Sequence, residues 1–474
     1  MGEESVYEHL ISSSDRHSLV GQETLSPPDQ QSKDEDGDRQ KRRNMTILII
    51  CCSFSMLGYG IYTTAYSQWI YVRFEMDALG ANFSKLNQSA SKDPCFRGNH
   101  TDSPFKPLLM EAQSNSAHFS MLITLCSLVP SFFVNILLGA YSDQLGRRLI
   151  FIVPLAGNVA RTAIVCAVAF WNLNVNFVLL AYTVHGLTGD YIAFIMAVFV
   201  YTADNTTKGK DRSFLMVFTQ AVITICYYLS QLATGYYIEA LGYVWPMVTG
   251  LGGLCVAFLI ALFFLHETLD KSKVDRVTFM QGIRKVFSFY FHKPSNPMNK
   301  RKDFLLLGFI FLIFAGSYGS SITTIFLMNE PFCWGAKQIG YVNSGFGLAQ
   351  SMFSTGYGAG SMESPVLPII RAILSRMVRT EERGSLFASI AVIETAAIAA
   401  SGAGLNELYA TSVDRWRGLT YFVIGCIVFF SAVLMLAYKS IIFRRQPQSA
   451  ALKIEVSRQY EKINTSESDC EDIG

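Results

Sequence analysis

The sequence comprises 474 residues with a formal net charge of +2 at pH 7, and 50% of its residues are hydrophobic whereas only 16% are charged. A soluble protein usually carries about 25% charged residues, so this composition excludes an ordinary soluble domain and indicates an all-α polytopic membrane protein. Nothing in the sequence indicates nucleic-acid binding. It also has no nucleotide-binding loop, no metal-ligand cluster and no nucleophile placed beside a base, so we predict neither an enzyme nor a bound cofactor.

The first segment, residues 1–44, is polar and has no apolar periodicity, so we predict a disordered cytoplasmic tail. Basic residues at the end of this tail place the amino terminus in the cytoplasm, because cytoplasmic flanks of membrane helices are enriched in Lys and Arg. They are Arg39, Lys41, Arg42 and Arg43. Residues 45–265 form a predicted six-helix bundle. Its spans are expected at 45–66, 119–141, 149–171, 176–200, 214–235 and 244–265.

A polar stretch at 67–118 separates the first two spans, and we predict that it forms a loop on the outer side. It contains clustered Asn-X-Ser/Thr acceptors at Asn82, Asn87 and Asn99. A single acceptor often arises by chance, but a cluster on the side opposite the basic tail predicts a glycosylated lumenal or extracellular loop.

The short connection between the second and third spans, residues 139–148, reads GAYSDQLGRR. Gly139 and Gly146 allow tight turns, and Arg147 and Arg148 hold the loop in the cytoplasm. Asp143 either pairs with Arg147, as a gate that favours the outward-open state, or caps the next helix. These five residues resemble the loop 2–3 signature of the major facilitator superfamily. The resemblance implies two bundles of six helices and transport by alternating access.

A hydrophilic, basic loop at 266–303 follows the sixth span and lies in the cytoplasm between the two halves. The second half, 304–438, is a shortened helical bundle. Its spans are expected at 304–326, 341–374, 385–405 and 419–438. We therefore predict about 10 of the usual 12 spans and a cytoplasmic tail at 439–474, so that both termini are cytoplasmic.

The cysteines agree with this topology. Of the ten, only Cys95 and Cys333 lie in predicted outer loops, whereas the others fall in spans or in the cytoplasmic tail, where thiols stay reduced. We therefore predict a disulfide between Cys95 and Cys333 that joins the two halves on the outer face.

Several short motifs resemble solute carrier family 46, which includes the proton-coupled folate transporter. They are Gly189-Asp190, Pro331-Phe332-Cys333-Trp334, Ile339-Gly340-Tyr341, and Pro368-Ile369-Ile370-Arg371 ahead of Leu374-Ser375-Arg376-Met377-Val378. The resemblance runs from the first helix to the last. It implies inward transport of organic solutes, often anionic, together with protons, and it also implies the disulfide predicted above.

Two departures limit what the resemblance implies. Between about Gln350 and Gly360 the chain lacks a segment that in the family covers most of helices 8 and 9 and the start of helix 10. In addition, Gln220 and Gly316 stand where the folate transporter has a glutamate in helix 5 and a histidine in helix 7. Folate specificity is therefore not supported, and we keep Gln220 as a candidate substrate-binding residue.

Ionisable residues within the spans are candidate functional groups, because a charge near the bilayer centre is costly and is retained mainly where it pairs or handles substrate or protons. Asp190 is the first candidate for proton binding, and its alternative is a structural aspartate beside Gly186 and Gly189. Glu394 is a second carboxylate candidate. His185 could assist protonation or could be a hydrogen-bonded packing residue.

Two arginines within the spans are candidate substrate-binding residues. Arg371 could pair with an anionic substrate or with Glu394, since a guanidinium binds carboxylates with two parallel donors. Arg161 in the third span is comparable.

Two functions remain open. The leading hypothesis is a secondary active transporter that moves a small organic solute (an organic anion, folate-like or muropeptide-like) into the cytosol by proton symport, driven by the proton gradient alone. The alternative is a non-transporting shortened isoform or degenerate relative that acts as a membrane partner or regulator. Tyr460-Glu461-Lys462-Ile463 fits the pattern that clathrin adaptors bind, so both the plasma membrane and an endosomal or lysosomal membrane are predicted locations.

Overall fold

The computed structural model describes most of the hydrophobic part of the chain. The described residues are 28–80, 106–141, 145–206, 210–268, 300–318, 322–329, 332–355, 383–416 and 418–438, with the single positions 281, 284, 370, 371, 374 and 440. None of these residues lies in a β-strand. The structure divides into two compact units, Met1–Thr46 and Ile47–Gly474, and the packing and the site described below lie within the second unit.

Seven helices make up the described part of the first half. They are α2 (Pro28–Leu79), α4 (Lys106–Ala140), α6 (Arg147–Phe170), α7 (Phe177–Leu187), α8 (Asp190–Asp204), α9 (Lys210–Leu241) and α10 (Val244–Phe264). Each predicted span of this half corresponds to one of these helices or to the pair α7 and α8. Crossing the hydrocarbon core takes about 20 apolar residues, which these runs supply.

The described second half is more interrupted. It contains α12 (Lys300–Ala315), the 3-10 turn η3 (Gly316–Tyr318), α13 (Thr323–Met328), α14 (Ala336–Thr355), α16 (Arg383–Ser412) and a further helix at Leu419–Tyr438. Within the described ranges, eight helices are long and apolar enough to cross a membrane. The predicted span at 304–326 is not one of the eight, because α12 has only 16 residues before η3 interrupts it.

The structure differs from the sequence-based boundaries at two places. α2 begins at Pro28, so residues 28–44 are helical where a disordered tail was predicted. α2 and α4 also extend into both ends of the predicted outer loop at 67–118. The extension of α2 buries Trp69, Ile70 and Tyr71, which accounts for continued helix in a stretch that looked polar.

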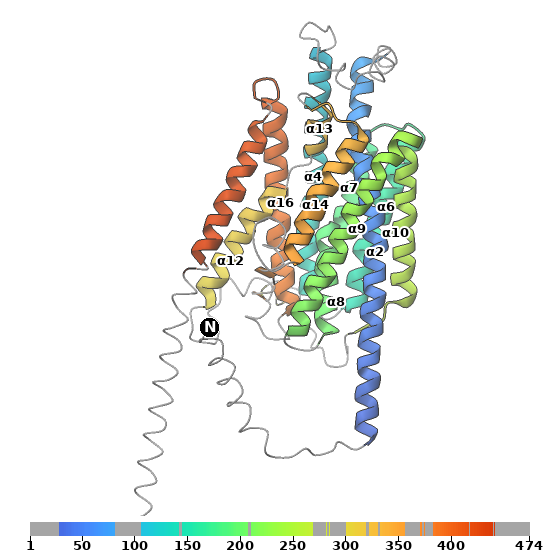
Figure 1. Ribbon diagram of the computed structural model, residues 1–474, viewed down its shortest axis with the longest axis vertical. Helices are drawn as coiled ribbons and strands as arrows, with labels where there is room; N and C mark the ends of the chain where they lie inside the picture. The colour runs from blue at the N-terminus through green and yellow to red at the C-terminus, as the bar shows by residue number, and fades with distance from the viewer. Residues whose placement is uncertain are drawn as a thin grey trace, which may run out of the picture. The chain divides into compact units, whose positions relative to one another are not determined.

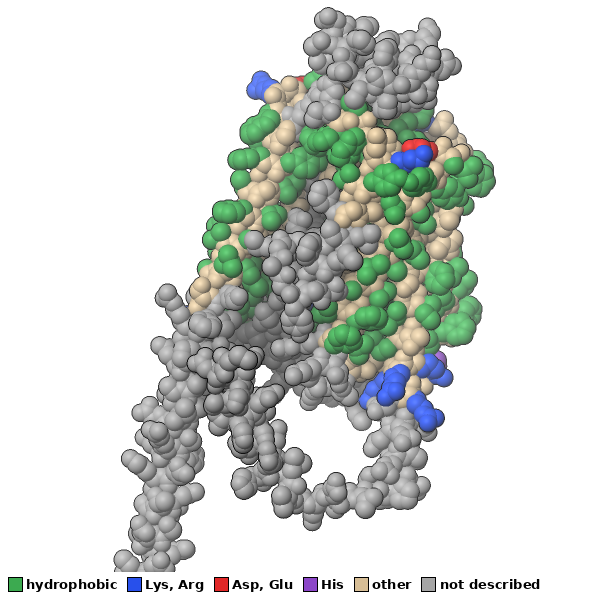
Figure 2. Space-filling model, in the orientation of Figure 1, with side chains coloured by type: hydrophobic (Ala, Val, Ile, Leu, Met, Phe, Trp, Pro, Cys, Tyr) green, Lys and Arg blue, Asp and Glu red, His purple; other side chains and the backbone are tan. Residues whose placement is uncertain are grey.

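The two halves meet along two pairs of helices. α16 packs along α4, and α14 packs along α9 (Figure 1). Outside these contacts, hydrophobic side chains cover much of the visible flank of the helices (Figure 2). The exposed large hydrophobic side chains include Phe133, Phe218 and Phe263. An apolar outer surface of this extent is the expected surface of a protein that faces lipid.

Small residues let α2 and α10 approach closely. A Cβ on Gly250 would lie only 2.7 Å from the Gly58 carbonyl oxygen, whereas a Cβ on Gly252 would meet nothing within 4 Å. We expect Gly250→Val to lower the free energy of unfolding by at least about 1–3 kcal/mol, the usual cost of overpacking, and Gly252→Val to be close to neutral. Thermal unfolding of the two purified variants in detergent checks this. Equal midpoints would contradict the close packing of these helices.

The fourth membrane crossing is broken in its middle. α7 ends at Leu187, and the backbone then turns through Gly189 and Asp190, which have φ values of 99° and 62°. A non-glycine residue with positive φ costs about 1–3 kcal/mol and persists where the surroundings hold it. Gly186 supports the break, because a Cβ there would lie 2.1 Å from the Ser127 carbonyl oxygen of α4.

Candidate functional site

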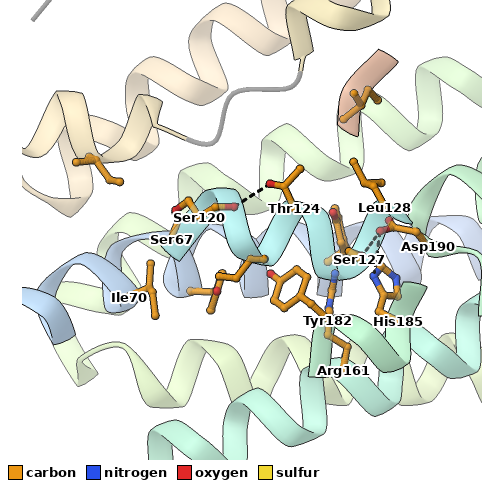
Figure 3. Close-up of a pocket in the computed structure, with 15 residues that line it drawn as sticks. Ser67, Ile70, Ser120, Thr124, Ser127, Leu128, Arg161, Tyr182, His185 and Asp190 are labelled. Carbon is orange, nitrogen blue, oxygen red and sulfur yellow. Dashed lines mark hydrogen bonds and ion pairs between the residues drawn. The ribbon is translucent and has the colours of Figure 1, made fainter. Parts of the chain in front are cut away.

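A cavity of about 250 Å³ lies beside this break, between helices of both halves (Figure 3). Residues from α2, α4, α6, α7 and α8 line most of it, and Ile325 of α13 and Ile398 of α16 line it from the second half. The lining residues from the first half are Tyr59, Tyr66, Ser67, Ile70, Ser120, Ile123, Thr124, Ser127, Leu128, Arg161, Tyr182, His185 and Asp190. The lining therefore combines apolar walls with a few polar groups, as in ligand sites generally.

Asp190 lies at the first position of α8, where the helix amino terminus favours a negative charge. Its Oδ2 accepts a hydrogen bond from Ser127 Oγ, and its Oδ1 accepts one from the Tyr191 backbone N–H. His185 Nδ1 lies 3.6 Å from the same Oδ2, and its side chain is only 1% exposed. Figure 3 shows the three side chains of Ser127, His185 and Asp190 pointing toward one another. A carboxylate, an imidazole and a hydroxyl in contact form a group that can take up and release a proton.

Arg161 is buried in the wall of the same cavity, with 2% of its surface exposed. Its guanidinium carbon lies 4.7 Å from the ring centre of Tyr62, and 5.3 Å from those of Tyr59 and Tyr182. In the described part of the structure its Nε and Nη2 have no hydrogen-bond partner. A buried cation with unused donors is costly, so these N–H groups are a candidate anion-binding position.

The tyrosines around Arg161 were not predicted as site residues. The sequence did carry a signal, since Tyr59, Tyr62 and Tyr66 recur at the three- and four-residue spacing of one helix face. The same spacing is common on helix faces that only pack against other helices. The position of Arg161 against these rings is what distinguishes a binding site from such a packing face.

Arg371 and Glu394 form a second buried group outside this cavity. Arg371 Nη2 lies 2.5 Å from Glu394 Oε2, and the guanidinium lies 5.5 Å from the ring centres of both Phe199 and Phe311. The sequence left two partners open for Arg371, a substrate and Glu394, and in the structure the partner is Glu394. Gln220 also does not line the cavity. Its side-chain amide donates to Thr224 Oγ1 at 3.2 Å within α9.

The predicted gating motif is described only in part. Asp143 lies outside the described residues, so its pairing with Arg147 stays a prediction. Arg147 Nε donates to Asp204 Oδ2 at 2.7 Å, and its backbone N–H donates to Glu267 Oε1 at 2.8 Å. Sequence reasoning missed both carboxylates. Three other residues of the motif are described. Gly139 is buried near the end of α4, and Gly146 precedes α6 with a φ of 93°. The Arg148 side chain donates to the Leu262 carbonyl oxygen.

Polar contacts join the two halves at the end of the helices predicted to face outward. His118 Nδ1 lies 2.8 Å from Glu407 Oε2, and the Gln113 amide donates to Asn329 Oδ1 at 2.7 Å. Lys337 Nζ lies 2.5 Å from Glu239 Oε2, and this hydrogen bond raises the pKa of Lys337 above its usual value. These contacts hold the two halves together at this end.

Several predicted features lie outside the described residues. They are the acceptors Asn82, Asn87 and Asn99, the cysteine Cys95 and the tail motif at Tyr460. Cys333 is described and buried between α13 and α14, so its disulfide with Cys95 stays a prediction. Within the described ranges, no three His, Cys, Asp or Glu side chains lie close enough together to hold a metal ion.

Two helical halves that enclose a cavity with a buried cation and a buried carboxylate define a membrane solute transporter. Comparison with known proteins agrees with this class. The chain belongs to the Major Facilitator Superfamily, whose family model matches residues 48–362, more than half of its length. This confirms the fold class predicted from the motif at residues 139–148.

Similar sequences confirm the resemblance to solute carrier family 46. The chain is 24% identical over 428 residues to the proton-coupled folate transporter of Bos taurus, covering 82% of this chain and 90% of the relative. It is 23% identical over 437 residues to the lysosomal proton-coupled steroid conjugate and bile acid symporter SLC46A3 of Homo sapiens, covering 82% of this chain and 93% of the relative. Each alignment is longer than the part of this chain that it covers, so the relatives contain residues that this chain lacks.

Solved structures show the same fold. The human organic anion transporter MFSD10 matches with a TM-score of 0.57 at 15% identity, covering 87% of this chain and 99% of that chain. The nucleoside transporter NupG matches with a TM-score of 0.51 at 11% identity, covering 84% of this chain and 99% of that chain. The chain is therefore an integral membrane protein with a transporter fold.

Proposed function

We propose that this chain is a secondary active transporter that moves a small organic anion into the cytosol together with a proton. The observation that carries the proposal is the presence of Arg161, with unused donors, in the same cavity as Asp190 and His185. The named functions of the relatives, proton-coupled transport of folate and of steroid conjugates, support the same class of reaction.

The cavity suits an amphipathic anion. The guanidinium of Arg161 binds the anionic group, and the tyrosine rings that surround it offer faces on which a flat substrate can stack. Hydroxyl-bearing Ser67, Ser120 and Thr124 also line the wall, as do the apolar Ile70 of α2 and Ile325 of α13. A substrate with one acidic group and an apolar body would satisfy both parts of the lining.

Charge balance in the cavity explains how proton and substrate are coupled. With His185 neutral, the empty cavity holds one positive charge on Arg161 and one negative charge on Asp190. An anion on Arg161 and a proton on Asp190 again give zero net charge, whereas either one alone leaves the cavity charged. Because a charged interior is costly within the membrane, only the empty and the fully loaded carrier rearrange readily. An acidic compartment outside the cell or inside the lysosome then drives uptake toward the cytosol.

Uptake of labelled organic anions tests the proposal. Cells expressing the chain are assayed at acidic (about pH 5.5) and neutral outer pH with folates, amphipathic organic anions and small muropeptides, and surface protein is quantified in parallel. We expect acid-stimulated uptake that falls about ten- to hundredfold in Arg161→Gln, the effect of losing hydrogen bonds to a charged group. Arg161→Lys keeps the charge but loses the planar donors, so partial activity is expected.

A matched control comes from α2. Arg73→Gln also removes one arginine, but Arg73 pairs with Asp77 at 3.6 Å near the helix end and does not line the cavity. It should transport like the wild type. Wild-type protein that reaches the surface and moves none of these compounds would favour the alternative, a non-transporting membrane partner. Unchanged uptake in Arg161→Gln would refute the proposal that Arg161 binds the anionic group of the substrate.

A further inference from the structure

A chain of buried hydrogen bonds connects the break beside Asp190 with the second half of the molecule. Ser131 Oγ of α4 donates to the Gly189 carbonyl oxygen at 2.8 Å. The side-chain amide of Asn135, one turn further along α4, donates to Ser131 Oγ at 3.1 Å and to Thr395 Oγ1 of α16 at 3.0 Å. All three side chains have an exposed fraction of 0%.

Each end of this hydrogen-bonded chain lies next to a largely buried carboxylate residue. Gly189 immediately precedes Asp190, and Thr395 immediately follows Glu394, the partner of Arg371. Asn135 is the member that crosses between the halves, and it does so along the extensive contact of α4 with α16. Its Oδ1 has no hydrogen-bond partner among the described residues. A buried amide with one unused acceptor is not optimised for stability alone, since such a group costs free energy.

We propose that Asn135 and Thr395 are positioning residues that couple protonation of Asp190 to the movement of the second half, and this inference rests on the transport function proposed above. The titratable and charged groups that face Asp190 are His185 of α7 and Arg161 of α6, with Tyr59 of α2 and Tyr182 of α7 around Arg161. Neutralisation of Asp190 weakens its contacts with His185 and Ser127, so the strained backbone at Asp190 can relax.

The Gly189 carbonyl oxygen then moves away from Ser131, and Ser131 Oγ, which accepts from the Asn135 amide, turns with it. The Asn135 amide follows Ser131 and no longer donates to Thr395 Oγ1. Release of Thr395 frees α16 to shift along α4. Movement of one bundle against the other around a central site is the usual form of alternating access. The coupling element is thus a two-state hydrogen-bonded chain whose state depends on one proton.

Three variants of α16 and α8 isolate the role of the Thr395 hydroxyl. Thr395→Val keeps the shape and removes the acceptor, whereas Thr395→Ser keeps the acceptor. Thr202→Val is the matched control, because Thr202 is an equally buried threonine that donates to the backbone four residues earlier, as Thr395 also does. Asn135→Ala, alone and combined with Thr395→Val, tests whether the two residues act through the same contact.

The first readout is the pH profile of uptake. We expect Thr395→Val to reduce the ratio of uptake at acidic to neutral pH by about fivefold, the effect of about one buried hydrogen bond, with little change in substrate KM. Thr395→Ser and Thr202→Val should keep the wild-type ratio. The double variant should have the same ratio of acidic to neutral uptake as the more affected single variant. A purely structural threonine would lower uptake equally at both pH values and would overturn the inference.

The second readout needs no substrate. Spin-labelled non-natural amino acids at the exposed positions 115 on α4 and 411 on α16 report the distance between these helices in the purified protein. We expect acidification alone to change this distance in the wild type and in Thr395→Ser, but not in Thr395→Val. The change reports a first displacement of α16, short of the full rearrangement that needs the bound anion as well. The coupling would be overturned if the distance did not change with pH in the wild type, or if it still changed with pH in Thr395→Val. A pH-dependent distance in a protein that transports none of the anions would instead refute the proposed function and leave the coupling standing.

Discussion

Asp190→Asn is expected to abolish net acid-driven uptake while substrate exchange across the membrane persists. Asparagine has nearly the shape of aspartate but cannot bind the transported proton. In this variant the cavity with an anion on Arg161 is neutral and can rearrange, whereas the empty cavity carries one uncompensated positive charge. Return of the empty carrier is therefore blocked, since moving a buried charge through the membrane interior is costly.

The pH dependence follows from the same argument. In the wild type, raising the outer pH lowers the fraction of Asp190 that holds a proton, so uptake falls as the pH rises. In Asp190→Asn no proton is needed, so exchange of internal for external substrate should be independent of pH, and net uptake at acidic pH should fall at least about tenfold. Uptake and exchange are compared in vesicles preloaded with unlabelled substrate or with buffer.

The control for this experiment is Asp77→Asn. Asp77 lies on α2 with a half-exposed side chain and pairs with Arg73 at 3.6 Å, away from the cavity. Its replacement should leave both uptake and its pH dependence unchanged. Wild-type acid stimulation in Asp190→Asn would mean that Asp190 only supports the helix break, which is the structural alternative raised by its position beside Gly186 and Gly189.

The sequence was sufficient to predict the helical class and the first half of the fold. Apolar runs and flanking basic residues are local signals, and they predicted the six crossings between Met45 and Leu265. The helix ends were less predictable, because the extensions of α2 and α4 depend on burial of residues such as Trp69 against other helices. The second half was harder still, since η3 at Gly316 interrupts the helix predicted at 304–326.

The candidate site also depends on tertiary contacts that leave no local signal in the sequence. Asp190 and His185 were identified separately, but a spacing of five residues places two side chains on different faces of a regular helix. The left-handed backbone at Gly189 and Asp190 brings them to 3.6 Å. A contact such as that between Asn135 and Thr395 joins residues 260 positions apart, and no local pattern indicates it.

Removal of one member of the Arg371–Glu394 pair is expected to destabilise the protein more than removal of both. Both side chains are largely buried, at 10% and 13% exposed, and each is the hydrogen-bond partner of the other. Arg371→Gln leaves a buried carboxylate without its cation, and Glu394→Gln leaves a buried guanidinium without its anion. Loss of one partner of a buried ion pair typically costs about 3–5 kcal/mol, whereas replacement of both by neutral residues is often close to neutral.

Unfolding of the two single variants and the double variant in detergent measures this non-additivity. The exposed pair Lys337–Glu239 is the matched control, because its N–O distance is the same 2.5 Å while both side chains are about 40% exposed. Its single and double variants should differ little from the wild type, since water screens an exposed pair. Additive effects at Arg371 and Glu394 would contradict the pairing in the folded protein.

Transport by the double variant decides what the pair contributes beyond stability. If the double variant folds and retains acid-stimulated uptake, Glu394 is not a second proton site and Arg371 does not bind the substrate. The proton is then bound by Asp190 and the substrate by Arg161. We expect this result, because Arg371 and Glu394 satisfy each other and neither lines the cavity. A folded double variant without uptake would instead mean that the Arg371–Glu394 pair takes part in transport. Glu394 would then act beside Thr395, its neighbour on α16.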